Sequence, residues 1–375
     1  MKPIQMVDLK GQYAKIKEDI NAGIQSVIDS ATFVKGGMVQ TFQKHLEDYL
    51  NVKHVIPVGN GTDALQISLM ALGLKPNDEV ITPTFTFVAT AEVVALLGLT
   101  PVVVDVDADT FCMSIDGVKK AITPRTKAIV PVHLFGQNAE MEELLKIAKE
   151  HNLHVIEDAC QSIGSTYTFS DGRTIQSGCM GDIGCTSFFP SKILGCYGDG
   201  GAIFTNNDSL AQEIQCIANH GMMERYHHDK IGVNSRLDSI QAAILDVKLN
   251  YLDSYIEARQ KAAAYYDKAF ANNPNIQIPV RNPKSSHVFH QYTVQINEKI
   301  NRNELQKKLG EKGIPAMIYY PIPLHLQKAY KNERYKQGDF PNAEKLAKTV
   351  LSLPMHTELE EEQLEYITKT LISLL

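Results

Sequence analysis

The sequence lacks the features that mark nucleic-acid-binding, membrane and secreted proteins. Its 37 lysines and arginines are outnumbered by 43 aspartates and glutamates, which gives a net charge of −6. A general nucleic-acid-binding protein usually carries a basic excess, so we exclude that class. The most apolar stretch, residues 93–106, is interrupted by Gly98, Thr100 and Pro101, so it does not predict a membrane span. No signal peptide is evident, and we expect a cytoplasmic protein.

Cysteine is scarce and scattered, and no internal repeat or low-complexity tract is present. None of the six cysteines forms a Cys-x-x-Cys pair, which is the spacing of many zinc and redox motifs. We therefore expect no metal site, and reduced, buried cysteines as in a cytosolic protein. They are Cys112, Cys160, Cys179, Cys185, Cys196 and Cys216.

What the chain does have is a regular alternation of strand-like and helix-like segments. Apolar strand patterns occur at 54–58, 79–82, 101–105, 127–132, 154–158, 186–189 and 201–205, and helix patterns at 62–74, 89–97 and 139–151. This order predicts an α/β fold with a mainly parallel sheet between helices. In such sheets ligands bind at the carboxyl ends of the strands.

The pattern changes in the last third of the chain. A long helix is predicted over 238–263, then a strand over 288–296 and helices over 302–310 and 358–374. With 375 residues, the chain is long enough for one large and one smaller domain. We expect a large domain over 1–250, including an N-terminal segment, and a smaller α+β domain over 251–375.

Lys192 lies in the most informative segment, between an apolar run and a glycine-rich turn at 198–201. A lysine in this position is suited to act as a nucleophile towards a carbonyl cofactor. A solvated loop lysine is the alternative, and this segment alone does not decide between them.

The segment Gly59-Asn-Gly-Thr-Asp63 lies between a predicted strand and a predicted helix. Glycines there let backbone N–H groups approach an anion, and the N-terminus of the helix adds positive potential. A phosphate is the expected ligand, and a plain turn capped by Thr62 or Asp63 is the alternative. A dinucleotide site is weakly supported, because Ala64 stands where the third glycine of that motif belongs.

Asp158 ends the apolar strand 154–158, where a carboxylate is unfavourable unless it meets a cation or hydrogen-bond donors. A protonated pyridine nitrogen would satisfy it, whereas capping of the next turn is the alternative. Gln161 could donate to a ring oxygen of the same ligand. Phe87 follows the strand end at Thr82 and could stack on a flat ring or belong to the core.

Two further segments are rich in polar side chains. Asn234 and Arg236 precede the long helix, with Arg225 and His228 just upstream, and the residues 319–325 contain Tyr320 and His325. The arginines and histidines could bind carboxylates or phosphates, or could form a solvated basic patch. His325 could equally be a structural histidine.

The motifs at 59–65, 157–161, 187–192 and 198–201 occur in the order that is typical of the DegT/DnrJ/EryC1/StrS family of sugar aminotransferases. The chain therefore resembles this family. The resemblance covers nearly the whole chain and implies the fold of type I pyridoxal-phosphate enzymes. It implies that Lys192 forms the Schiff base, that Asp158 pairs with the pyridinium nitrogen, and that Gln161 contacts the phenolic oxygen. The remaining cofactor contacts implied are Phe87 on the ring, and Gly61, Thr62, Asp63 and Ser187 around the phosphate.

The resemblance also implies a homodimer with shared active sites, in which Asn234 reaches the phosphate in the neighbouring subunit. The reaction implied is transfer of an amino group from L-glutamate, through the pyridoxamine form of the cofactor, to a keto sugar nucleotide. One branch of the family has histidine in place of this lysine and dehydrates sugars, so Lys192 favours aminotransfer.

The segments around 185–192, 225–228 and 232–238 look most like the subgroup acting on UDP-linked 3-keto-N-acetylglucosaminuronic acid for bacterial surface polysaccharide. Substrate contacts are expected from Arg236, Tyr320, His325, Arg225 and His228. Aminotransferases of 4-keto and other 3-keto sugars share most of the motifs and stay open. A nicotinamide-dependent oxidoreductase would need an acid after the strand at 79–82, which ends in Thr-Pro instead. A non-catalytic regulatory homologue is the third alternative.

Overall fold

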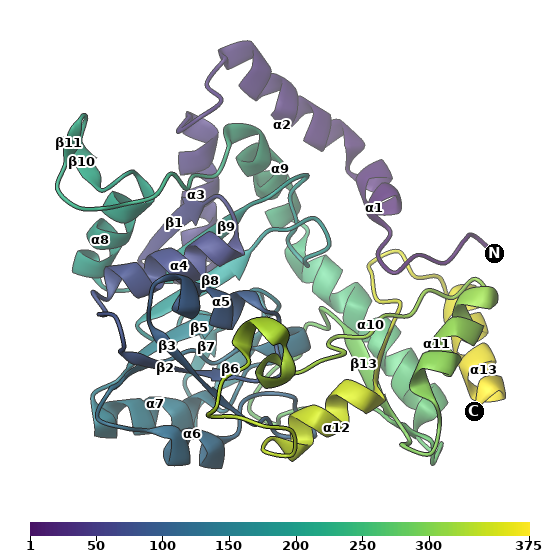
Figure 1. Cartoon of the computed structure of the whole chain (residues 1–375). Coiled ribbons are helices and arrows are strands. Elements are labelled where there is room, and N and C mark those ends of the chain that lie inside the picture. Colours follow the sequence, from purple (N-terminus) through teal and green to yellow (C-terminus); the bar gives the residue numbers. More distant parts are fainter.

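The centre of the computed structural model, which describes residues 1–375, is a seven-stranded sheet (Figure 1). The strands lie in the order β1-β9-β8-β5-β4-β2-β3, and β9 alone runs against the others. The mainly parallel α/β sheet predicted from the sequence is therefore confirmed. Its strands are β1 (His54–Val58), β2 (Glu79–Pro83), β3 (Thr100–Val104), β4 (Thr126–Ile129), β5 (His154–Asp158), β8 (Ile183–Ser187) and β9 (Gly201–Thr205).

Helices cover both faces of this sheet because successive strand residues point to opposite sides. Val155 and Ile156 are neighbours on β5 and pack into two different apolar clusters. One face is covered by α4 (Gly61–Ala71), α5 (Ala89–Leu96) and α8 (Asp208–Ala218). The other is covered by α6 (Ile115–Ala121) and α7 (Met141–His151), and near β1 by α3 (Gly37–Leu50) and α9 (Ser239–Leu249).

Strand β4 is shorter than the predicted strand 127–132. Pro131 has no N–H to donate to the ladder. The regular strand therefore ends at Ile129, and pairing resumes only as a single bridge between Val132 and Asp158.

The helix predicted over 238–263 is wrong as a single element, since it divides into α9 and α10 (Leu252–Phe270). The break lies at Asn250, whose side-chain amide donates to the Asp246 carbonyl at 3.1 Å. Its backbone N–H bonds instead to the Val247 carbonyl, one residue later than in a regular helix. The division into domains at 250/251 coincides with this break and stays a prediction.

The C-terminal unit contains a small antiparallel sheet of β12 (Ile276–Gln277), β13 (Tyr292–Ile296) and β14 (Val350–Leu353). Helices α10, α11 (Arg302–Glu311) and α13 (Glu361–Leu374) pack against it. The start of the chain joins this unit, because Ile4 belongs to its core (Figure 1). The strand predicted from 288 begins only at Tyr292, since Phe289 has a φ of 50° and cannot be extended there.

The remaining elements lie around these two units. They are α1 (Leu9–Lys15), α2 (Lys17–Ser30), α12 (Pro341–Thr349), the hairpins β6 (Thr166–Thr168)–β7 (Thr174–Gln176) and β10 (Met222–Glu224)–β11 (His227–His228), and the 3₁₀ turns η1 (Leu134–Gly136), η2 (Leu324–Leu326) and η3 (Lys328–Tyr330). None of the helices combines the length and the apolar character that crossing a membrane requires.

Candidate active site

A cavity of about 700 Å³ lies at the carboxyl ends of the parallel strands. Its wall is formed by the first turn of α4, the segment after β2, the ends of β5 and β8, and the loops at 189–192, 290–291 and 319–320. The sequence analysis predicted a ligand at this edge of the sheet. The cavity therefore brings together side chains from segments that are far apart in the chain.

Lys192 lies in the loop between β8 and β9 and lines this cavity, so it is not a solvated loop lysine. Burial lowers the pKa of its amine, which Cys160 and Asp158 partly oppose. A lower pKa increases the share of neutral amine, the form that attacks a carbonyl carbon. Lys248 also holds this loop in place, because its ammonium donates to the Gly195 carbonyl at 2.7 Å.

Asp158 is the last residue of β5 and is only 6% exposed. One carboxylate oxygen accepts from the Thr90 hydroxyl at 2.8 Å, and the other accepts from the Cys160 amide at 3.3 Å. The contact with Cys160 corresponds to the turn-capping alternative. Because the carboxylate also lines the cavity, it combines this local role with access to a ligand.

Gln161 is placed in the cavity by two hydrogen bonds. Its carbonyl oxygen accepts from the Phe135 amide at 2.9 Å, and its amide donates to the Tyr320 hydroxyl at 3.3 Å. Phe87 also lines the cavity and is 54% exposed, so the reading of this ring as core is wrong. Its centroid lies 6.3 Å from that of Tyr320.

The first turn of α4 forms the predicted anion site. The helix begins at Gly61 and its N-cap is Asn60, whose side chain accepts from the Asp63 amide at 2.8 Å. The alternative that Thr62 or Asp63 caps the helix is therefore wrong. The amides of Gly61 and Thr62 belong to the first turn and have no partner within the helix.

Gly61 allows this turn to lie close to the end of β8, where a side chain would not fit. A Cβ atom added to Gly61 would lie 2.7 Å from Cβ of Ser187 and 3.0 Å from Sγ of Cys160. The Asp63 carboxylate is directed to Ser235, whose hydroxyl donates to it at 2.6 Å. The residues present thus suit an anion bound by N–H groups and by the Thr62 and Ser187 hydroxyls.

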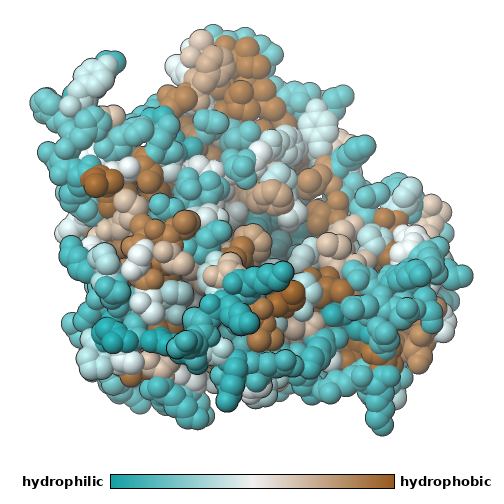
Figure 2. Space-filling view, viewed as in Figure 1, coloured by the Kyte–Doolittle hydropathy of each residue, from teal (hydrophilic) through white to brown (hydrophobic).

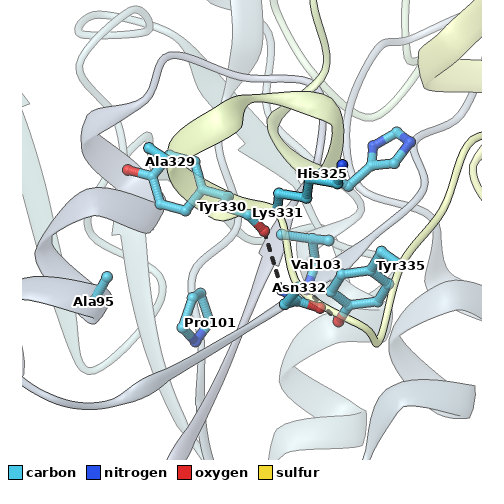
Figure 3. A pocket seen from close by; sticks show the side chains of 9 residues that line it. All are labelled: Ala95, Pro101, Val103, His325, Ala329, Tyr330, Lys331, Asn332 and Tyr335. Carbon is cyan, nitrogen blue, oxygen red and sulfur yellow. Dashed lines mark hydrogen bonds between the residues drawn. The ribbon is translucent and has the colours of Figure 1, made fainter.

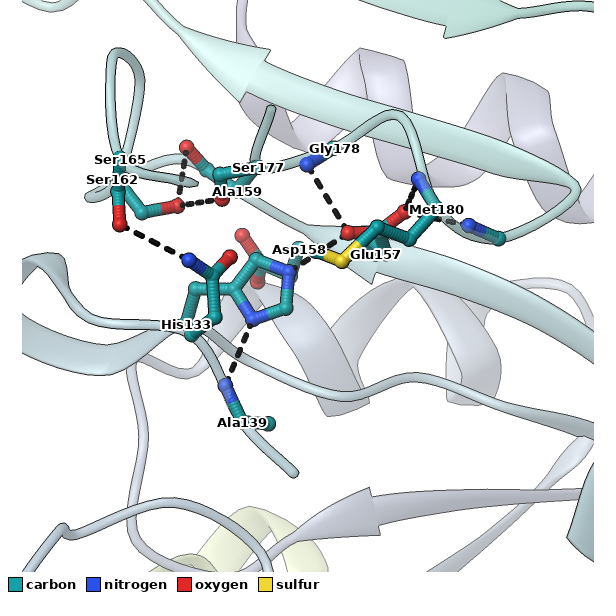
Figure 4. Close-up of polar contacts among 12 residues, drawn as sticks. His133, Ala139, Glu157, Asp158, Ala159, Ser162, Ser165, Ser177, Gly178 and Met180 are labelled. Atoms are coloured by element: carbon teal, nitrogen blue, oxygen red, sulfur yellow. Dashed lines mark hydrogen bonds and ion pairs between the residues drawn. The ribbon is translucent and has the colours of Figure 1, made fainter. Parts of the chain in front are cut away.

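Behind Asp158, the fully buried side chains of His133 and Glu157 are hydrogen-bonded to each other, a contact that the sequence analysis did not identify (Figure 4). The His133 ring is 2.8 Å from Glu157, and its other nitrogen accepts from the Ala139 amide at 3.1 Å. The Glu157 carboxylate also accepts from the amides of Gly178, Met180 and Gly181, at 2.9, 2.6 and 2.6 Å. The pair joins the ends of β4 and β5 to the loop before β8.

Five of the predicted site residues lie away from the Lys192 cavity within one chain, and four of them come from residues 225–236. Asn234 is exposed and pairs with Asn219 through an isolated bridge. Arg236 lines a second cavity of about 550 Å³. Arg225 and His228 are exposed on the β10–β11 hairpin, which projects from the body of the molecule (Figure 1).

His325 is buried outside the cavity that contains Lys192. Its ring lies 2.9 Å from the Thr84 hydroxyl and 3.2 Å from the Glu344 carboxylate. It borders a smaller pocket of about 180 Å³ beside Tyr330 and Tyr335 (Figure 3). Within one chain, His325 therefore has the surroundings of a structural histidine, whereas Tyr320 lies in the main cavity.

Sequence reasoning missed Thr90, Gln291 and His290, which also belong to the site. Thr90 lies in a helix that reads only as apolar, so its hydroxyl carried no signal. Gln291 and His290 line the cavity from a segment that was read as strand. His290 lies in that predicted strand and His287 directly precedes it, and this pair of histidines was a signal that could have been used.

A cavity that combines a lysine, a buried carboxylate and a helix turn suited to phosphate, on this sheet, defines a pyridoxal-phosphate enzyme of the type I fold. The chain belongs to the DegT/DnrJ/EryC1/StrS aminotransferase family, whose model matches residues 14–372. Pyridoxal phosphate is accordingly its cofactor.

The chain is similar along nearly its whole length to known proteins. It is 47% identical to the UDP-2-acetamido-2-deoxy-3-oxo-D-glucuronate aminotransferase of Pseudomonas aeruginosa, with 98% of this chain and 99% of the relative covered. It is 46% identical to a pleiotropic regulatory protein of Geobacillus stearothermophilus, with 98% and 97% covered. Among solved structures, S. venezuelae DesV in complex with a ketimine intermediate has a TM-score of 0.94 and 38% identity, with 100% and 98% covered.

Proposed function

We propose that this enzyme transfers the amino group of L-glutamate to C3 of UDP-2-acetamido-2-deoxy-3-oxo-glucuronic acid. The observation that carries the reaction type is the single cavity in which Lys192 and Asp158 lie beside the first turn of α4. The sugar is supported by the relative from Pseudomonas aeruginosa, which bears the name of this activity and is similar over the whole chain. We place the reaction in the cytoplasm and in the synthesis of a bacterial surface polysaccharide.

Each of these cavity residues would have a separate role in the reaction. Gly61, Thr62 and Ser187 would hold the phosphate, with the helix N-terminus adding positive potential. Asp158, held by Thr90, would keep the ring nitrogen protonated, and Phe87 and Gln161 would position the ring. When bound, the cofactor supplies an electron sink for the electron pair left by proton loss at the reacting carbon. The Lys192 amine, whose pKa is lowered by burial, would take and return that proton.

We further propose that the active unit is a homodimer in which Asn234 and Arg236 serve the neighbouring cavity. The support is that both lie away from the cavity of their own chain. The hairpin region exposes apolar side chains, with Met223 60%, Tyr226 74% and Ile231 89% exposed. Apolar side chains also gather over α2 at the top of the view in Figure 2. Exposed apolar surface of this kind favours association.

In such a dimer, Arg236 is suited to a carboxylate, which both L-glutamate and a uronic acid carry. Arg225, His228, Tyr320 and His325 stay predicted substrate contacts. Of these, Tyr320 has the most direct support, because it lines the cavity and bonds to Gln161.

The decisive experiment is an assay of the purified protein with L-glutamate and a panel of keto sugar nucleotides. The protein should be yellow, lose this absorbance with L-glutamate, and form an amino sugar from the 3-keto uronic acid. Lys192→Ala should fold and show no turnover. A colourless protein that pyridoxal phosphate cannot restore would refute the proposal, and preference for a 4-keto sugar would refute the substrate.

A mixing experiment tests the shared site. Lys192→Ala and Asn234→Ala should each be inactive alone, whereas subunit exchange between them should restore activity. A hybrid dimer then holds one cavity with both native residues. Equal mixtures that stay inactive after demonstrated exchange would show that the sites are not shared.

A regulatory role is the second candidate, because a relative of 46% identity bears the name of a regulatory protein. It predicts cofactor binding without amino transfer. The same panel separates the two, since a regulator would retain its yellow form with every substrate pair.

A further inference from the structure

His290 is a buried histidine in the wall of the Lys192 cavity that has no role in the mechanism above. Its side chain is 6% exposed, and its Nδ1 atom has no hydrogen-bond partner within the protein. A buried polar atom without a partner costs about 1–3 kcal/mol, so it is rare unless function requires it.

The other buried histidines near this site are bonded. His133 uses both ring nitrogens, and Nδ1 of His287 accepts from the Phe289 amide at 3.0 Å. These two histidines have the contacts expected of structural residues. Neither ring nitrogen of His290 bonds to the protein, and only Nδ1 is completely buried, so Nε2 is the nitrogen that a ligand in the cavity can reach.

The backbone around His290 is held in a strained conformation. Phe289 has a φ of 50°, in the left-handed region that non-glycine residues rarely adopt, and its ring stacks on His287 with centroids 3.9 Å apart. A buried arginine, Arg259, donates to the carbonyls of Phe289 and His290, at 3.0 and 3.4 Å. Backbone strain held by many contacts is typical of functional sites.

The loop at 134–136 fixes the same segment from the other side. Gly136 has a φ of 114°, and a Cβ atom there would lie 2.9 Å from the amide nitrogens of both Phe289 and His290. The Val288 amide donates to the Gly136 carbonyl at 2.9 Å. His290 is therefore presented to the cavity by a rigid frame.

The surroundings of His290 favour the neutral form of its imidazole. Burial lowers its pKa well below the ordinary range, and the positive charges of Lys192 and Arg259 lower it further. A neutral imidazole offers one donor and one acceptor, so it can bond a polar group of either kind.

We propose that His290 is a substrate-contacting residue, whose imidazole hydrogen-bonds a polar group next to the carbon that carries the transferred nitrogen. Both substrates of the transfer occupy this position in turn, so both should depend on His290. The inference rests on the proposed function and deepens it by naming a contact on the Lys192 side of the cavity.

The test compares His290→Phe, His290→Gln and the native full-length enzyme, with L-glutamate as the probe. The half-saturating concentration of L-glutamate for loss of the yellow absorbance should rise about tenfold in His290→Phe, as expected for one lost hydrogen bond. His290→Gln keeps a polar atom near the position of Nε2 and should recover part of this loss. Retention of pyridoxal phosphate on dialysis should be unchanged in both.

Thermal stability distinguishes a substrate contact from a structural role, because replacing a structural histidine would lower the melting temperature. The melting temperature of His290→Phe, with and without cofactor, should equal or exceed that of the native protein, because no protein bond at Nδ1 is lost. His356→Phe is the matched control: His356 is buried 3% exposed, also has one nitrogen without a partner, and lies outside the cavity. It should leave the glutamate dependence unchanged.

Three outcomes would overturn the inference. They are an unchanged glutamate dependence in His290→Phe, release of the cofactor, which would make the contact one to the cofactor, and a lowered melting temperature with no rescue by glutamine. If the native enzyme itself fails to respond to L-glutamate, the proposed donor is refuted. The ratio of variant to native is then measured with the amino acid that does convert the yellow form.

Discussion

His133 and Glu157 form a 2.8 Å pair that is fully buried directly behind the carboxylate that faces the cofactor site. Glu157 precedes Asp158 on β5, so their side chains point to opposite faces of the sheet. The His133 amide also donates to the Asp158 carbonyl at 3.0 Å. The pair and this backbone bond both connect His133 to the end of β5, and together they fix the position of Asp158.

Glu157→Gln should therefore weaken cofactor binding as well as the fold. The carboxylate accepts from one ring and three amides, whereas glutamine would place an NH₂ group against some of these donors. Each buried donor left without an acceptor costs about 1–3 kcal/mol. We expect a lower free energy of unfolding in urea and faster loss of pyridoxal phosphate on dialysis.

Glu79→Gln is the matched control for this variant. Glu79 is also fully buried, and Thr123, Arg125 and Arg334 lower its pKa to about 2 against the effect of burial. It begins β2, so it lies at the opposite edge of the sheet from the cavity. It should lose stability with cofactor retention unchanged, and equal retention in the two variants would contradict a positioning role for Glu157.

The sequence alone allowed the parallel sheet and the cavity to be predicted because both depend on local patterns. Apolar runs define the strands, and Lys192, Asp158 and Gly61 stand at strand ends, where chain topology brings them together. The break at Asn250 was not predictable, because it depends on one side-chain amide replacing a backbone donor. His290 was missed since burial and the lack of a partner appear only in three dimensions.

Asn60 should separate the stability of α4 from its affinity for phosphate. Asn60→Ala removes the cap on the Asp63 amide and should cost about 1 kcal/mol of stability. Asn60→Asp keeps an acceptor for that amide but adds a negative charge beside the predicted phosphate site. We expect native-like stability in urea for the aspartate variant and a dissociation constant for pyridoxal phosphate at least about tenfold higher.

The comparison of these two variants contains its own control. If the turn binds the phosphate, alanine should chiefly affect unfolding and aspartate chiefly affect the cofactor, as followed by absorbance during dialysis. Equal cofactor affinity in Asn60→Asp and the native enzyme would mean that the phosphate binds elsewhere.

Lys248 should make the stability of the enzyme rise with pH. It is 1% exposed, and burial lowers its pKa to about 8 from an ordinary value of 10.5. Below pH 8 the folded and unfolded chains both hold the proton, and the fold bears the full cost of the buried charge. Between pH 8 and 10.5 the unfolded chain keeps the proton that the folded chain has released, so stability increases with pH.

Lys248→Met isolates this effect, because methionine fills a similar volume without a titrating group. The difference in free energy of unfolding, native minus variant, should grow by about 3 kcal/mol between pH 8 and 10.5. Urea titrations at several pH values measure it, and the other titrating groups cancel in the difference. A difference that stays constant over this range would show that the folded protein keeps the proton on Lys248 at all of these pH values. Since its amine supports the Gly195 carbonyl, three residues after Lys192, the variant should also weaken the loop that presents the reactive lysine.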